Sequence, residues 1–186
     1  MTNLSDFSDD EIDRILDAPG AVLKGATLAD GEPGGLRFLL ETAAGAKVFR
    51  EAQVHENDFV RSVAVALRAR IDEQSAAEEE ARRNPASQVG VAAAAAATQE
   101  AATVGVRPDP EGAAAQAVEL TGAAVGLLRE RGDEKDAVAY AEWVLRIAEQ
   151  VAGAAATKEG GFFSRRVKVS ASEQDYLDRL AAAVGR

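Results

Sequence analysis

Hydrophobic residues recur every three or four positions along most of this chain, which is the spacing of an amphipathic helix rather than of a strand. Leu36, Leu39 and Leu40 share one side of such a pattern and predict a helix over about 35–53. No alternating run is longer than the three residues 167–169. The pattern predicts an all-α protein of seven or eight helices, packed as a bundle or as two unequal helical halves.

Helix start signals divide this pattern into segments. Ser8 stands three residues before Glu11, and Ser170 stands three residues before Glu173, which is the spacing of a capping box. Asn57 or Asp58 is a suitable cap for a further helix. With Pro19 as a break or as the first position of a new helix, the predicted helices cover about 8–18, 19–29, 35–53, 57–84, 110–131, 133–159 and 170–184.

The apolar positions also predict which side of each helix faces the core. In 57–84 the apolar stripe is Phe59, Val63, Ala66, Leu67 and Ile71, and the residues after it are polar on all sides. In 133–159 the predicted inner positions, flanked by Trp143 and Ile147, are Val138, Ala141, Leu145, Ala148 and Ala152. The stripe of the final helix consists of Leu177, Leu180, Ala181 and Val184.

The region 85–109 separates two helical parts of the chain. It is rich in Ala and low in complexity, so it is either a linker or a weakly packed helix. We therefore divide the chain into an N-terminal helical half, 1–84, this region, 85–109, and a C-terminal helical half, 110–186. The two halves are expected to pack as one unit.

Composition and charge narrow the class of protein. Hydrophobic residues make up 47% of the 186 residues and aromatics only 5%, so the core is built largely from small side chains. The net charge of −10 argues against nucleic-acid binding. The chain contains no Cys, its first residues do not resemble a signal peptide, and no apolar run is long enough to span a membrane. We expect a cytoplasmic protein.

The first and last predicted helices begin alike, with a hydrophobe, a capping Ser and a Glu three residues on. Duplication of a helical unit would explain this match. The match is short, however, which favours the other explanation, that unrelated helices often begin with the same capping signal.

The stretches "VAGAAATKEGG", "VSASEQDYLDRLAAAVG" and "ATLADGEPGG" resemble the bacterial TerB-like (tellurite-resistance) proteins. That resemblance implies an all-helical fold with two related halves and divalent-metal binding by acids of Asp-Gly loops.

Acidic residues in two turns are the candidates for a metal site. Asp30 and Glu32 lie in one predicted turn and Glu159 begins another, so the three could hold Ca²⁺ or Mg²⁺ if the turns meet. The alternative is that they are ordinary turn residues. His55 is the only histidine, which excludes any site that needs two imidazoles. We predict no other cofactor and no catalytic residue.

The segment between the last two predicted helices is the candidate binding surface. In an acidic chain it carries two aromatic rings and a cluster of cations, namely Phe162, Phe163, Arg165, Arg166 and Lys168. These cations could simply cover a helix carboxyl end. Aromatic rings beside arginines are also a typical binding composition. We therefore expect a non-catalytic protein that acts by self-association or as an adaptor, with TerB-like metal binding as the alternative.

Overall fold

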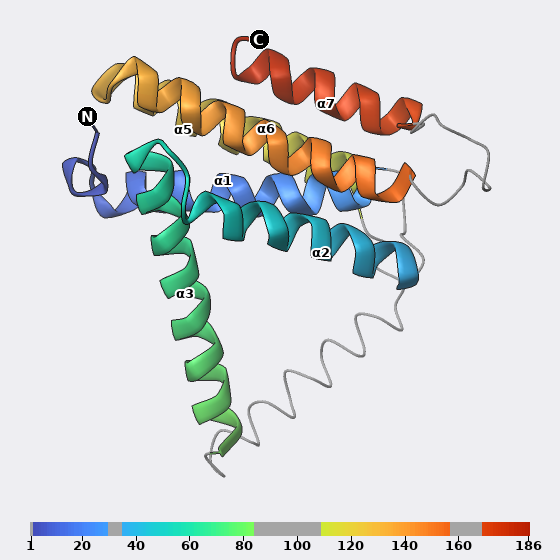
Figure 1. Ribbon diagram of the computed structural model, residues 1–186, viewed down its shortest axis with the longest axis horizontal. Helices are drawn as coiled ribbons and strands as arrows, with labels where there is room; N and C mark the ends of the chain where they lie inside the picture. Colours follow the sequence, from blue (N-terminus) through green and yellow to red (C-terminus); the bar gives the residue numbers. More distant parts are fainter. Residues whose placement is uncertain (1, 30–34, 84–108, 157–168) are drawn as a thin grey trace. The chain divides into compact units, whose positions relative to one another are not determined.

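The computed structural model describes residues 2–29, 35–83, 109–156 and 169–186. Over these residues the chain forms six α-helices and one short 3-10 turn, and no strand. The 3-10 turn is η1 (Leu4–Asp6), and the helices (Figure 1) are α1 (Asp9–Leu28), α2 (Gly35–Ala52), α3 (Asp58–Arg83), α5 (Pro110–Arg131), α6 (Glu134–Ala156) and α7 (Ala171–Ala183). The prediction of an all-α, bundle-like fold is confirmed.

The described residues contain fewer helices than the seven or eight predicted, because α1 runs unbroken through Pro19. A proline inside a helix has no N–H for the carbonyl four residues earlier, which here belongs to Ile15. The hydroxyl of Tyr140, on α6, donates to that carbonyl at 2.7 Å and so replaces the missing bond. The further helix considered for the Ala-rich region falls on 85–109, of which 85–108 lie outside the described residues.

Side chains at the predicted helix starts form the expected caps. The Ser170 N–H donates to the Glu173 carboxylate at 2.8 Å, and the Glu173 N–H donates to the Ser170 hydroxyl at 3.1 Å. At α1 the Ser8 N–H donates to Glu11 at 2.8 Å. The Asn57 side chain accepts from the Val60 N–H at 3.0 Å and so begins α3. These bonds satisfy backbone N–H groups that the first turn of a helix leaves without partners.

The core is centred on α6, which packs against α1, α2, α5 and α7. Its fully buried residues include Ala137, Tyr140, Val144, Ile147 and Val151. The predicted inner residues Val138 and Leu145 are only half-buried. The predicted inner residues Ala141, Ala148 and Ala152 are buried, and so are Trp143 and Ile147. The predicted face is therefore confirmed at three of its five positions, and the buried face is wider than predicted, because a helix with neighbours on several sides buries more than one narrow stripe.

Small residues let the helices approach one another closely. α1 packs on α5, and Ala18 and Ala26 of α1 and Ala117 and Ala124 of α5 are all nearly or fully buried. A Cβ atom added to Gly45 of α2 would collide with the side chain of Leu23 on α1. The small-residue core expected from the composition is thus present in the described helices.

Five aromatic rings form a continuous series through the core. Ring centroids are 6.5 Å apart for Phe7–Phe59, 6.3 Å for Phe59–Tyr140, 5.9 Å for Tyr140–Trp143 and 5.8 Å for Trp143–Phe49. The series joins the N-terminal segment, α3, α6 and α2. Large rings therefore supply specific contacts that the alanine-rich helices lack.

The chain divides into two compact units, and the division falls inside α3. The first unit contains residues 1–65 and 109–186, and the second contains 66–108. Within the first unit, Phe59, Val60 and Val63 of α3 are buried. In the second unit, Ala66 and Leu67 are half-buried, but Ile71 is 53% exposed and not an inner residue as predicted.

Candidate functional site

The residues predicted to form the binding surface, Phe162, Phe163, Arg165, Arg166 and Lys168, lie outside the described residues. The three predicted metal ligands, Asp30, Glu32 and Glu159, also lie outside them.

The helix ends next to these segments lie together at one end of the first unit. α1 and α6 run in the same direction, so that Leu28 and Ala156 end them on the same side, where α2 and α7 begin (Figure 1). Neither α1 nor α6 has a basic residue in its last turn. The carboxyl ends of helices carry partial negative charge and the amino ends partial positive charge, so the starts of α2 and α7 offset the ends of α1 and α6 here.

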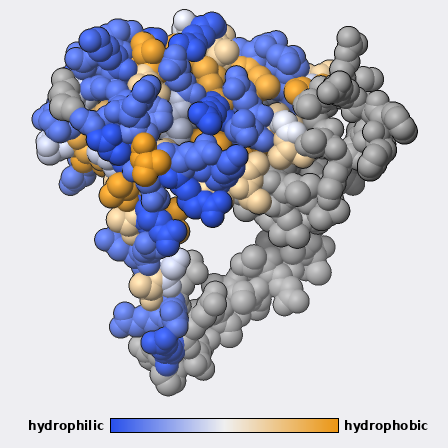
Figure 2. Space-filling view, in the orientation of Figure 1, coloured by the Kyte–Doolittle hydropathy of each residue, from blue (hydrophilic) through white to orange (hydrophobic). Residues whose placement is uncertain are grey.

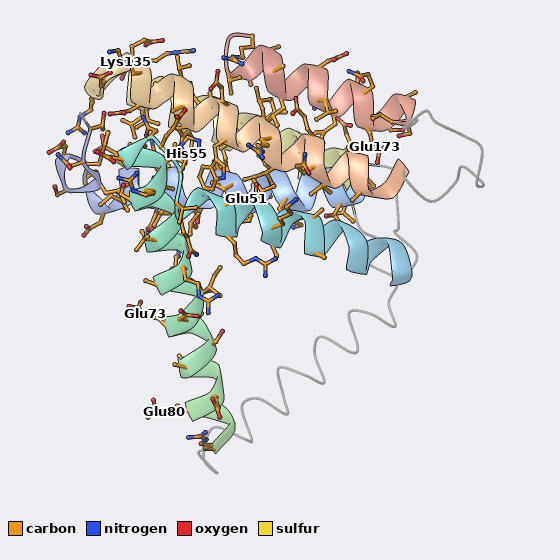
Figure 3. All side chains as sticks on the ribbon, viewed as in Figure 1. Glu51, His55, Glu73, Glu80, Lys135 and Glu173 are labelled. Carbon is orange, nitrogen blue, oxygen red and sulfur yellow. The ribbon has the colours of Figure 1, made fainter. Side chains whose placement is uncertain are left out.

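The last helix is anchored to this unit by its own apolar face. Tyr176 and Leu180 of α7 are buried, and the Tyr176 hydroxyl donates to the Val22 carbonyl of α1 at 3.1 Å. Glu173, labelled in Figure 3, is also buried and closes the cap of α7. The predicted stripe is confirmed at Leu180 and Val184, while Leu177 and Ala181 are only half-buried. The buried face also includes Glu173 and Tyr176. The face that remains exposed on α7 is polar.

A second surface lies along the later turns of α3. Every described side chain from Ile71 to Arg83 is exposed, and hydrophilic residues predominate there (Figure 2). Two ion pairs run along the helix, Arg68 with Asp72 at 2.9 Å and Arg83 with Glu79. Exposed pairs of this kind add little stability. The sequence pattern predicts that this section is polar on all sides, and the exposure of its described side chains agrees with that prediction.

A buried polar network lies at the opposite end of the first unit. The Asp136 carboxylate accepts from the Thr2 N–H at 2.7 Å and from the Asn57 side-chain amide at 2.8 Å. The Asp133 N–H donates to the Thr2 hydroxyl at 2.8 Å. Burial alone would raise the pKa of Asp136, but these donors outweigh it and the pKa is lowered. The network joins the N-terminal segment, the start of α3 and the α5–α6 turn.

His55 stabilises the turn before α3 through hydrogen bonds of its ring and its carbonyl. Its Nδ1 accepts from the Asn57 N–H at 3.1 Å, and its carbonyl accepts from the Arg61 guanidinium at 2.6 Å. The side chain is labelled in Figure 3. Its contacts are those of a residue that shapes a helix start, which is the role its polar neighbours indicate.

Sequence reasoning did not find the Asp136 network, because its members lie up to 134 positions apart. The only local signal is Asn57, whose capping ability was recognised. The arrangement fixes three chain segments relative to one another.

The described residues contain neither a candidate metal-binding cluster nor a candidate membrane-spanning helix. No three His, Cys, Asp or Glu side chains gather there in a way that could hold a metal ion. None of the described helices combines the length and the apolar character that crossing a membrane requires.

Comparison with known proteins found no family model, no curated protein and no solved structure that matches this chain.

Proposed function

We propose that the protein acts through protein–protein contacts, by self-association or as an adaptor, and not by catalysis. The observation that carries this proposal is the later part of α3, where every described side chain from Ile71 to Arg83 is exposed. A helix gains most of its stability from packing an apolar face. A partner that covers Leu67 and Ile71 would supply that packing.

The cationic aromatic segment Phe162–Lys168 is proposed as a second contact surface. It follows α6 in the sequence, and neither α1 nor α6 has a basic residue in its last turn. Because the apolar face of α7 packs within its own chain, the segment, rather than the final helix, supplies the apolar and cationic groups for a partner. An acidic surface, including that of a second copy, is the expected counterpart.

Mass in solution tests the proposal. Light scattering on the full chain over a range of concentrations should give a mass that rises above the 19.4 kDa monomer. The double variant Phe162→Ser, Phe163→Ser should associate less if the segment takes part. Truncation after Gly160 is unsuitable, because it removes the buried Tyr176 and Leu180. A monomer at every concentration would contradict self-association.

Divalent-metal binding of the TerB type is a second proposal, supported by one observation. The segments with Asp30, Glu32 and Glu159 follow α1 and α6, whose last turns lie at the same end of the first unit. Calorimetry with Ca²⁺, Mg²⁺ and Mn²⁺ on metal-free protein should then show binding that Asp30→Asn weakens. Absence of heat together with an unchanged melting temperature would refute this second proposal.

A further inference from the structure

We propose that α3 pairs with α3 of a second copy, in antiparallel orientation, with Gln74 on the two-fold axis. This inference rests on the proposed function and names its partner and its surface. The surface consists of residues 66–83, which form the helical part of the second unit that the structure describes.

The apolar basis of the pairing is a stripe that continues along α3. Val60 and Val63 are buried in the first unit, and the same three- and four-residue spacing leads to Leu67, Ile71 and Gln74. Leu67 is half-buried and Ile71 is 53% exposed. Positions spaced in this way form the seam between two paired helices. After Val63 the apolar side chains of the stripe are thus incompletely covered.

The order of charges along this section selects the partner and its direction. Arg68 and Arg70 come first, acids follow, among them Asp72, Glu73 and Glu80, and Arg82 and Arg83 end the section. Figure 3 shows the labelled Glu73 and Glu80, one heptad apart, along the later turns of α3. Parallel pairing would place acids beside acids. Antiparallel pairing places the basic turn of each helix at the level of the acidic turns of the other, which is the favourable arrangement.

One register places the apolar positions in the seam and also brings the basic turn of each helix beside the acidic turns of the other. With Gln74 on the axis, Arg70 lies on the same flank of the seam as Glu80 of the second copy and within one turn of it, and Ile71 lies level with Ala77. Asp72 and Glu73 then lie level with Ala76 and Ser75, so that they avoid other acids. Two Gln74 amides that meet on the axis can donate to and accept from each other. A single polar residue within an apolar seam is a known means of fixing register.

The pairing is expected to be weak and dependent on concentration. One face of a five-turn helix buries less area than the usual stable interface of about 1,600 Å². Arg68 also contacts Asp72 within its own helix at 2.9 Å. Both charges are largely exposed, so this contact adds little stability.

Two matched variants test the surface by sedimentation equilibrium on the full chain. Ile71→Glu places a charge in the seam and should weaken dimerisation by at least about tenfold, equivalent to about 1.4 kcal/mol. Val54→Glu adds the same charge at a valine that is 81% exposed and lies outside α3. It should leave dimerisation unchanged. Equal effects of the two variants, with circular dichroism showing intact helices, would overturn the proposal.

Single cysteines test the orientation, because the chain has no Cys of its own. On mild oxidation Gln74→Cys should form a disulfide-linked dimer. Leu67→Cys should not, because antiparallel pairing separates two copies of position 67 by about 20 Å along the helices at 1.5 Å per residue. Cross-linking of both variants would indicate parallel pairing and refute the antiparallel register. Association of the unmodified chain without cross-linking at Gln74→Cys would refute this interface but leave the proposed function standing.

Discussion

At the scale of single residues, two tyrosine hydroxyls hold the backbone of α1 where its sequence is least typical of a helix. Tyr140 donates to the Ile15 carbonyl, which Pro19 leaves without its usual partner. Tyr176 donates to the Val22 carbonyl beside Gly25, where a Cβ atom would lie 2.8 Å from the hydroxyl. Burial raises the pKa of both tyrosines, which keeps the hydroxyls protonated as donors.

A double-mutant cycle tests the link between Tyr140 and Pro19. Tyr140→Phe should cost about 1–3 kcal/mol of unfolding free energy, because it leaves the buried Ile15 carbonyl unsatisfied. In a Pro19→Ala background the same change should cost less, because the N–H of the new alanine can bond that carbonyl. Urea denaturation of the four proteins measures the coupling. Strictly additive effects would show that the hydroxyl does not replace the missing bond.

A second pair of variants separates helix propensity from close packing at Gly25. Gly20 lies on the same helix with open space around its Cα, so Gly20→Ala should stabilise the protein by about 0.5–1 kcal/mol. Gly25→Ala makes the same change in propensity but forces Tyr176 away, and it should destabilise by about 1–3 kcal/mol. Thermal unfolding compares the two. If both variants were stabilised equally, the close approach of Tyr176 would have no energetic importance.

At the scale of elements, the start of α1 is fixed by charge as well as by its cap. Glu11 accepts from the Ser8 N–H at 2.8 Å and pairs with Arg131 at the end of α5. The same guanidinium lies 5.5 Å from the centre of the Phe7 ring. The bond from Ser8, followed by the one from Arg131, lowers the pKa of Glu11 from 4.5 to about 2. The ionised carboxylate therefore stabilises the folded state.

The pH dependence of stability follows from that shift. A carboxyl whose pKa is lower in the folded state contributes its full stabilisation above its unfolded value, here 4.5, and loses it as the pH falls toward about 2. Glu11→Gln should therefore flatten the curve of melting temperature against pH between these two values. Glu119→Gln, at an exposed position in α5, is the control. A curve for Glu11→Gln as steep as that of the unmodified chain would contradict the assignment.

The helices could be predicted well because the signals at their starts are local in the sequence. The features that were not predicted depend on contacts between residues far apart in the sequence. Ser170, Glu173 and Asn57 act within a few residues of their partners, so their caps could be predicted. The continuation of α1 through Pro19 depends on Tyr140, which lies 125 positions away from Ile15. The width of the buried face of α6 likewise depends on which helices surround it, and a single hydrophobic stripe carries no such information.

At the scale of the whole molecule, the all-α class and the small-residue core could be predicted from composition and periodicity. The Asp136 network could not, since its partners Thr2 and Asn57 come from segments that only the fold brings together. The exposed section of α3 was recognised as polar, but its role depends on the division of the chain inside that helix. The order of basic and acidic residues in this section supports the proposed pairing with a second copy only because the described side chains there are exposed.

The central claim is that a second copy covers the later turns of α3, and amide hydrogen exchange at several protein concentrations tests it most directly. We predict that residues 71–83 exchange more slowly as the concentration rises, because pairing protects their helix. Amides of the buried part of α6 serve as the internal reference and should not change. Exchange of residues 71–83 that is fast and equal at every concentration would contradict the account.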